Sequence, residues 1–103
     1  MEKTFDVEII TPDRVFYKGT ADLLEFNTES GEIGVYRDHI PLTTVLEPGL
    51  VTIHHGDEEQ VAAVHAGFAE ILGDKVTLLA ELAEWPQESG QRSGFTTEMT
   101  IWI

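Results

Sequence analysis

Histidines, serines and clustered carboxylates are the groups in this sequence that could carry out chemistry, and their spacing limits what that chemistry can be. His54 and His55 are adjacent in a segment with strand character, so they point to opposite faces and cannot bind one metal ion together. A cupin-type metal site places two histidines two residues apart on one face, and that spacing is missing here. His39 lies in a turn-rich loop, where we expect it to organise local hydrogen bonds rather than to catalyse. We therefore expect no metal site.

Nucleophile and nucleotide motifs are not indicated either. Ser30, Ser89 and Ser93 lie in turn-like or tail segments, and none stands in the Gly-x-Ser-x-Gly pattern of a nucleophile elbow. The sequence has no Gly-x-x-x-x-Gly-Lys-Ser/Thr loop for the phosphates of a nucleotide. The acidic run Asp57-Glu58-Glu59 falls at a predicted hairpin tip, where solvated carboxylates are ordinary. We therefore predict that the chain has no catalytic residue and no cofactor.

The elements that would position these side chains are short strands separated by turn residues. Phe5, Val7 and Ile9 alternate with Asp6 and Glu8, which is the period-two pattern of a half-buried strand. Turn signals recur about every 8–12 residues and no segment has a sustained helical period, which favours an all-β sandwich or barrel. The remaining predicted strands are 15–17, 23–26, 42–46, 50–55, 60–66, 68–72 and 75–81. The predicted turns or bulges are Thr11-Pro12-Asp13, Lys18-Gly19, Glu29-Ser30-Gly31, Gly34, Glu47-Pro48-Gly49, Gly56 to Glu59 and Gly73-Asp74.

Two of these strands carry apolar residues on both sides of the pleat, in the segments Leu50 to Ile53 and Val61 to Val64. A sheet with one face in water should alternate between apolar and polar residues instead. Either both faces of these strands are covered within the domain, or the outer face docks on another protein.

Length and charge restrict the class of protein. The 103 residues are enough for one small domain, and 42% hydrophobic residues argue against disorder. The formal net charge is −13, so a phosphate backbone or an anionic membrane surface is an unfavourable partner. No apolar run approaches the ~20 residues of a membrane-spanning helix, and the N-terminus does not resemble a signal peptide. The absence of cysteine excludes disulfides and is compatible with a reducing cytoplasm.

The last fifteen residues differ from the rest. We place one domain at residues 1–88 and treat residues 89–103 as a linker followed by an apolar tail. Ser89 to Gly94 has the composition of a flexible linker. The segment from Phe95 to Ile103 is too apolar for a comfortable solvated end, so it either adds as a strand to an exposed sheet edge or remains disordered.

Four motifs in register give a more specific indication. Together they resemble the N-terminal β-sandwich of the epsilon subunit of the F-type ATP synthase, over the stretch from about Phe5 to Trp85. The four motifs are Thr11-Pro12-Asp13, the run Gly31-Glu32-Ile33-Gly34-Val35-Tyr36-Arg37-Asp38-His39-Ile40-Pro41-Leu42 followed by Pro48-Gly49, the run Gly67-Phe68-Ala69-Glu70-Ile71, and the run Val76-Thr77-Leu78-Leu79-Ala80-Glu81.

The resemblance implies a small β-sandwich of about ten short strands in two sheets, and a non-catalytic rotor subunit in the central stalk of a proton- or sodium-translocating ATP synthase. It implies two protein partners, the gamma subunit and the polar loops of the c-ring, and a place at the cytoplasmic face of the bacterial inner membrane. The gamma-facing positions are Thr11, Pro48, Gly49 and Leu50, and the c-ring contacts are Glu32 and His39. Alone, the chain is expected to be monomeric and not to insert into the membrane.

One feature of the family is not matched, and one other class of function remains open. Family members continue into an inhibitory helical hairpin, whereas residues 89–103 do not resemble one, so we expect inhibition and ATP sensing to be absent. The alternative is a free-standing β-sandwich that binds a small ligand or a carbohydrate. Such a module would cluster exposed aromatic residues on one face, whereas the aromatic residues Tyr17, Tyr36, Trp85 and Trp102 are scattered along the sequence.

Overall fold

Buried and more exposed residues alternate along much of the chain, as expected for a fold made of strands. The structure is a computed structural model and describes residues 3–86 together with the backbone of 101–102. Along the first strand, Phe5, Val7 and Ile9 are buried while Asp6 is exposed, as the period-two pattern predicts. The strands are β1 Phe5–Thr11, β2 Arg14–Ala21, β3 Leu23–Thr28, β4 Gly31–Val35, β5 Leu42–Leu46, β6 Gly49–His55, β7 Glu58–Val64, β8 Gly67–Ile71, β9 Lys75–Ala80, β10 Ala83–Glu84 and β11 Ile101–Trp102.

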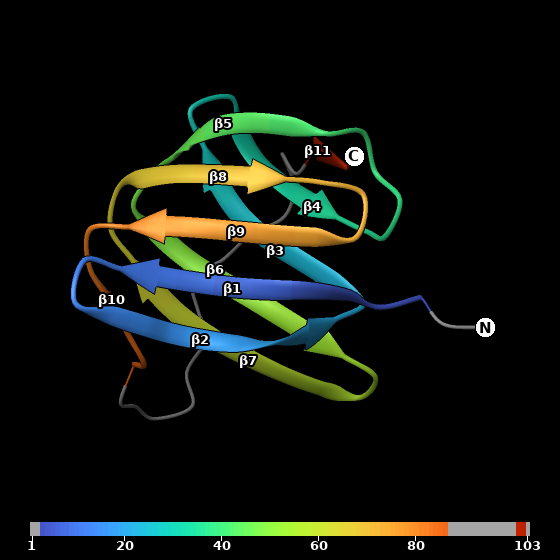
Figure 1. Ribbon diagram of the computed structural model, residues 1–103, viewed down its shortest axis with the longest axis horizontal. Helices are drawn as coiled ribbons and strands as arrows, with labels where there is room; N and C mark the ends of the chain where they lie inside the picture. The colour runs from blue at the N-terminus through green and yellow to red at the C-terminus, as the bar shows by residue number, and fades with distance from the viewer. Residues whose placement is uncertain (1–2, 87–100, 103) are drawn as a thin grey trace.

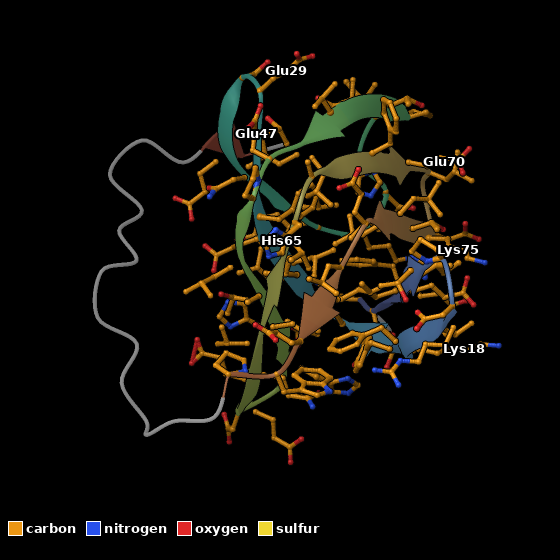
Figure 2. The ribbon with its side chains drawn as sticks, turned by 90° about the vertical axis from the view of Figure 1, so that its left-hand side faces the viewer. Lys18, Glu29, Glu47, His65, Glu70 and Lys75 are labelled. Carbon is orange, nitrogen blue, oxygen red and sulfur yellow. The ribbon has the colours of Figure 1, made fainter. Side chains whose placement is uncertain are left out.

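The strands form two layers that face each other across the core (Figures 1 and 2). The front sheet has the order β5-β8-β9-β1-β2, and the back sheet has the order β10-β7-β6-β3-β4-β11. Pairing is antiparallel except between β1 and β9 and between β4 and β11. The ladder pair of Thr28 with Leu46 joins the two sheets along one side, so the sandwich is partly closed like a barrel. The prediction of an all-β sandwich is confirmed.

Both sheets contribute their inward side chains to one apolar core. The largest fully buried side chains include Phe5 on β1 and Phe26 on β3, which come from opposite layers. Burying side chains of this size stabilises a fold by about 1.5–3 kcal/mol each. The other large buried side chains are Ile9, Leu24, Leu46, Ile53, Ile71, Leu78, Val7, Val35, Val51 and Val76. Among the described residues no helix is long and apolar enough to cross a membrane.

Two predicted turns are wrong. Lys18 and Gly19 do not turn the chain, because β2 runs without interruption from Arg14 to Ala21. The irregularity lies earlier, where the register with β1 shifts and leaves Phe16 as an extra residue on β2. Gly34 was expected in a turn or bulge, but it lies within β4 and pairs regularly with Glu25. Gly34 therefore leaves one position of β4 without a side chain, and the sequence is as consistent with a glycine inside a strand as with a glycine in a turn.

The other predicted turns lie at or beside turns of the structure, although some of their residues are already in strands, namely Thr11, Gly31, Gly49, Glu58 and Glu59. Pro12 and Asp13 separate β1 from β2, and Gly56 and Asp57 form the tight turn between β6 and β7. Gly31 and Gly56 have φ angles of 118° and 63°, which side chains with a Cβ rarely adopt.

The two-sided apolar strands β6 and β7 are covered unevenly. Val51, Thr52 and Ile53 are three consecutive buried residues on β6, so both of its faces are enclosed there. Leu50 and Val61 remain half-buried on the outer face of the back sheet. The covered stretch fits enclosure within the domain, whereas Leu50 and Val61 leave apolar surface on the outer face for a partner.

Candidate interaction surface

The outer face of the front sheet exposes a row of apolar side chains that crosses five strands. The register places Val45 of β5 opposite Phe68 of β8, Phe68 opposite Leu79 of β9, Leu79 beside Ile10 of β1, and Ile10 opposite Val15 of β2. Because paired residues point to the same side of a sheet, these five side chains form one continuous strip, which we call the apolar row. Phe68, Leu79 and Val15 are 55%, 46% and 53% exposed.

The bulge in β2 helps to complete this row. With Phe16 as the extra residue, Val15 comes opposite Ile10 on the outer face. Phe16 and Tyr17 instead pack against the core, where they meet Trp85. The Phe16 and Trp85 rings are stacked with centroids 4.8 Å apart, and Tyr17 meets Trp85 edge-on at 6.0 Å. Burial raises the pKa of Tyr17. Tyr17 and Trp85, which are scattered in the sequence, thus lie together in space.

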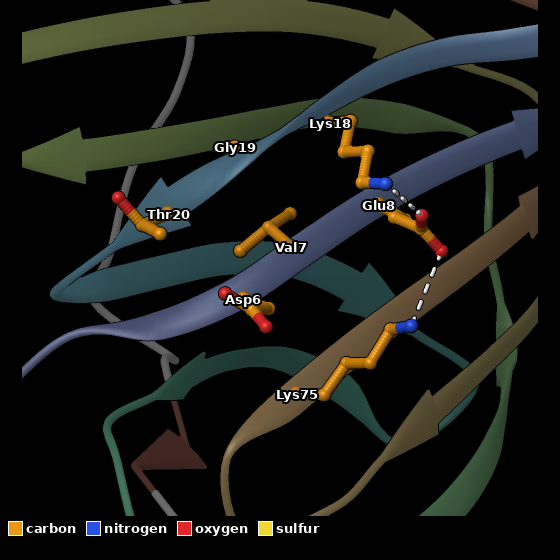
Figure 3. A pocket seen from close by; sticks show the side chains of 7 residues that line it. All are labelled: Asp6, Val7, Glu8, Lys18, Gly19, Thr20 and Lys75. Atoms are coloured by element: carbon orange, nitrogen blue, oxygen red, sulfur yellow. Dashed lines mark ion pairs between the residues drawn. The ribbon is translucent and has the colours of Figure 1, made fainter.

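A polar group borders the apolar row on the same face. Glu8 lies between Lys18 of β2 and Lys75 of β9 (Figure 3). Its carboxylate oxygens are 3.9 Å from the Lys18 Nζ and 3.4 Å from the Lys75 Nζ, so these are loose ion pairs that stabilise the fold little. The three side chains line a shallow hollow of about 320 Å³ together with Asp6 and Thr20. The apolar row therefore has a polar margin, as protein interfaces commonly have.

The predicted gamma-facing residues are not all on one surface. Thr11 is buried at the end of β1, where its hydroxyl is 3.0 Å from an Asp13 carboxylate oxygen and 3.2 Å from the Arg14 carbonyl. That hydroxyl therefore stabilises the β1–β2 turn. Pro48 is exposed and directly precedes β6, and Leu50 is half-buried within β6. Both therefore belong to the back sheet, whereas Thr11 belongs to the front sheet. The structure thus places Thr11 and Leu50 in different layers.

The two predicted c-ring residues lie toward opposite ends of β4, Glu32 near its start and His39 in the loop that follows its end. Glu32 is the second residue of β4 and is only 8% exposed, whereas Glu29 and Ser30, in the preceding turn, are exposed. His39 lies in the loop between β4 and β5 and is only 7% exposed.

The loop around His39 is held in place from several sides. Arg37 Nη1 donates to the Thr4 carbonyl at 2.6 Å, and the Asp38 amide donates to the Gly73 carbonyl at 2.8 Å. The His39 ring meets Phe5 edge-on at 6.1 Å, and neither ring nitrogen has a hydrogen-bond partner. Burial lowers the pKa of His39 because it disfavours the charged form. The structural role expected for His39 is thus one of packing rather than of hydrogen bonding.

A second group of polar side chains lies on the outer face of the back sheet. His54 Nε2 is 2.9 Å from Glu25 Oε1, and the Glu25 side chain is buried. In the described part of the chain, no three metal-ligating side chains lie close enough together to hold an ion. His54 and His55 point to opposite faces as predicted, since His55 contacts Thr20 while His54 pairs with Glu25.

The apolar row was missed at the level of sequence, although a signal for it exists. The segment Val76 to Ala80 is apolar at nearly every position, as are the two-sided strands β6 and β7. In this segment Leu78 faces the core and Leu79 is exposed. What the sequence could not supply was the register that aligns Leu79 with Phe68 and Ile10.

These features define the chain as a β-sandwich domain with an exposed apolar row on its front sheet, and comparisons with known proteins supply its family. Residues 4–86 match the family described as the ATP synthase delta/epsilon chain beta-sandwich domain. The chain is 42% identical over 89 residues to the ATP synthase epsilon chain of Caldanaerobacter subterraneus subsp. tengcongensis, which covers 85% of this chain and 64% of that protein. It is 48% identical over 81 residues to the epsilon chain of Brevibacillus brevis, covering 78% of this chain and 61% of the other. The chain belongs to the ATP synthase delta/epsilon family.

Solved structures show the same fold. A chain in the cryo-EM structure of the Euglena gracilis mitochondrial ATP synthase (OSCP/F1/c-ring) superposes with a TM-score of 0.78 at 18% identity, covering 86% of this chain and 57% of that one. A chain in the Tetrahymena thermophila mitochondrial ATP synthase central stalk and c-ring gives 0.65 at 12% identity, covering 89% and 77%. The present chain spans a little under two thirds of the length of the two bacterial relatives.

Proposed function

We propose that this chain is a non-catalytic rotor subunit of a proton- or sodium-translocating ATP synthase, in which it joins the gamma subunit of the central stalk to the c-ring. The observation that carries the proposal is the apolar row on a domain of the epsilon family. An isolated sandwich gains nothing from exposing Phe68, Leu79 and Val15 in one strip, whereas a subunit held in a complex buries them. The proposal places the chain at the cytoplasmic face of the bacterial inner membrane.

The apolar row is the surface that best fits the gamma subunit. It combines an aromatic and several aliphatic side chains on a rigid sheet, with the polar group of Glu8, Lys18 and Lys75 at its margin. Interfaces of this kind derive most of their affinity from a few central apolar residues that lose contact with water. Phe68 and Leu79 occupy the centre of the row and are therefore the candidates for that role.

A second surface for the gamma subunit is the outer face of the back sheet around Pro48, Gly49 and Leu50. Leu50 and Val61 contribute apolar area there, although both are half-buried already. Thr11 supports either surface only indirectly, through the turn that it stabilises. The two surfaces lie on opposite sides of the sandwich, so single substitutions can distinguish them.

The c-ring contact is proposed at the β3–β4 turn and at the loop between β4 and β5. Glu32 and the exposed Glu29 provide carboxylates at the first of these places, and such groups can pair with basic loop residues. At the second, His39 would act by holding the loop against Phe5, while Tyr36 and Ile40 are the large hydrophobic side chains that this loop exposes.

The test compares two exposed leucines. Leu79 lies in the apolar row, whereas Leu82, three residues later, is similarly exposed but lies outside it. Leu79→Asp should weaken binding to the cognate gamma subunit at least about 30-fold, consistent with a central interface residue that contributes ~2 kcal/mol or more. Leu82→Asp should leave the affinity unchanged, as measured by calorimetry or by pull-down.

Leu50→Asp supplies the comparison with the second surface. If this change abolishes binding while Leu79→Asp has no effect, the gamma subunit binds the back sheet. If wild-type protein does not bind gamma at all, the proposed function itself is wrong. Size-exclusion chromatography of the isolated chain tests whether it is monomeric.

A further inference from the structure

Apart from β11, β4 is the outermost strand at one end of the back sheet, and it has neither a bulge nor a lysine that would keep another strand from pairing with it. Gly31–Val35 pairs with β3 in an unbroken antiparallel register. Ile33 and Val35 point into the core, and Gly34 between them has no side chain. Strand edges with these properties present free N–H and C=O groups, which act as a template for a further strand.

Two other described sheet ends, β2 and β10, are protected in ways that β4 is not. At the outer edge of the front sheet, β2 contains the bulge at Phe16 and carries Arg14 and Lys18. Bulges and lysines are both features that discourage edge pairing. At the far end of the back sheet, β10 is only two residues long. The far edge of β5 is also largely open, since β5 meets β3 only through Leu46 and Thr28; among these described edges, β4 is distinguished by the strand that lies on it.

A strand from the C-terminal part of the chain lies on that edge. Ile101–Trp102 runs parallel to β4, with Ile101 opposite Ile33 and Trp102 opposite Gly34 (Figure 1). The family match ends at residue 86, so this strand comes from a part of the chain outside the matched domain.

We propose that the outer edge of β4 is a strand-binding site whose occupant is the C-terminal strand of the same chain. Docked there, Ile101–Trp102 pairs with the otherwise open ladder and keeps a second copy from adding its own strand. Glu32 directly precedes Ile33, so the docked strand also borders the carboxylate proposed for the c-ring contact. The strand-binding site does not depend on that contact.

The absence of cysteine makes a cross-linking test specific. Residues 34 and 102 are ladder partners, and paired strands bring Cα atoms within the roughly 4.4–6.8 Å that a disulfide requires. Under mild oxidation, the Gly34→Cys/Trp102→Cys variant should form an internal disulfide in the monomer. The control Gly34→Cys/Leu82→Cys should remain reduced, because Leu82 adjoins β10 at the opposite edge of the back sheet.

Mixing the two single variants, Gly34→Cys and Trp102→Cys, tests the alternative occupant. Disulfide dimers formed selectively in this mixture, without an internal disulfide in the double variant, would show that a second copy supplies the strand, which overturns docking within one chain. No disulfide in either experiment would overturn the site itself.

Hydrogen exchange tests the strand-binding site without substituting any residue of β4. Ile101→Pro removes a backbone donor and disfavours a paired strand, whereas Ile101→Val preserves both. Amides of β4 should exchange about tenfold or more faster in the proline variant, because local opening governs their protection. Equal protection of β4 in the wild type and in both variants would contradict the proposal.

Discussion

His39 illustrates how burial determines the behaviour of a single ionisable residue. Its ring packs against Phe5 and has no hydrogen-bond partner at either nitrogen. Protonation would therefore place a charge in a largely apolar environment, and the Asp38 carboxylate and nearby backbone groups offset only part of that cost. The pKa of His39 in the folded chain is lower than in the unfolded chain.

This lowered pKa predicts a loss of stability in acid. As the pH falls below about 6.5, the unfolded chain binds a proton at residue 39 before the folded chain does, so the free energy of unfolding decreases. Above that pH neither state is protonated and the effect disappears. His39→Leu should remove this part of the pH dependence, as measured by urea denaturation between about pH 5 and 7.5.

The exposed His65 supplies the control for this experiment (Figure 2). His65→Gln should preserve the wild-type slope of stability against pH. A His39→Leu variant with the same slope as wild type would show that another group causes the acid sensitivity.

At the scale of single residues, a sequence can identify site residues but not the direction in which their side chains point. Thr11 and Glu32 were singled out by the family motifs, but only the structure shows that both are largely buried and that the Thr11 hydroxyl is engaged in a turn. Conversely, Phe68 and Leu79 lie within recognisable motifs, yet nothing in the sequence indicates that their side chains point outward together. Orientation depends on register, and register is a property of paired strands.

At the scale of elements, strand existence was predictable and strand continuity was not. The alternation of apolar and polar residues located most of the strands, and turn residues such as Pro12 and Gly56 correctly marked where strands end. Lys18-Gly19 was misleading because a glycine in a strand and a glycine in a turn look alike in sequence. Here Gly19 lies beside Tyr17, and a Cβ at residue 19 would lie 2.5 Å from the Tyr17 hydroxyl. The Tyr17 side chain, two residues earlier on the same strand, therefore fills the space beside that glycine.

Gly67 at the start of β8 gives an element-scale prediction. A Cβ at this position would overlap the backbone carbonyl of Leu79 on the neighbouring strand, and a backbone atom cannot move aside cheaply. Gly67→Ala should therefore destabilise the fold by about 2–3 kcal/mol or more, as measured by urea denaturation. Gly73→Ala is the matched control, because no atom lies within 4 Å of a Cβ at residue 73.

Gly67→Ala should also disturb the apolar row, since Gly67 directly precedes Phe68 and approaches Leu79. Equal stability of the alanine variants at residues 67 and 73 would mean that β8 and β9 are packed less tightly than the structure indicates.

At the scale of the whole molecule, charge and apolar surface have separate roles. The net charge of −13 favours a partner with basic surfaces and accelerates encounter at low salt. It does not explain specificity, because the apolar row on the front sheet contains no charged residue. The proposed rotor role would use both properties, since it requires one partner to be held firmly while another is met at a different end. The two sheets and several loops of the sandwich offer separate surfaces for such contacts.

The last prediction concerns the boundary of the folded domain. Among the residues whose burial is described, the core lies between Phe5 and Ala83, and the family match ends at residue 86. Removing residues 89–103 should therefore leave a cooperative urea transition, because no described core side chain is lost. The same truncation removes β11 and leaves the β4 edge open, so the shortened chain should associate at high concentration, as measured by analytical ultracentrifugation. Loss of the cooperative transition would place the C-terminal segment within the core and move the domain boundary to the end of the chain.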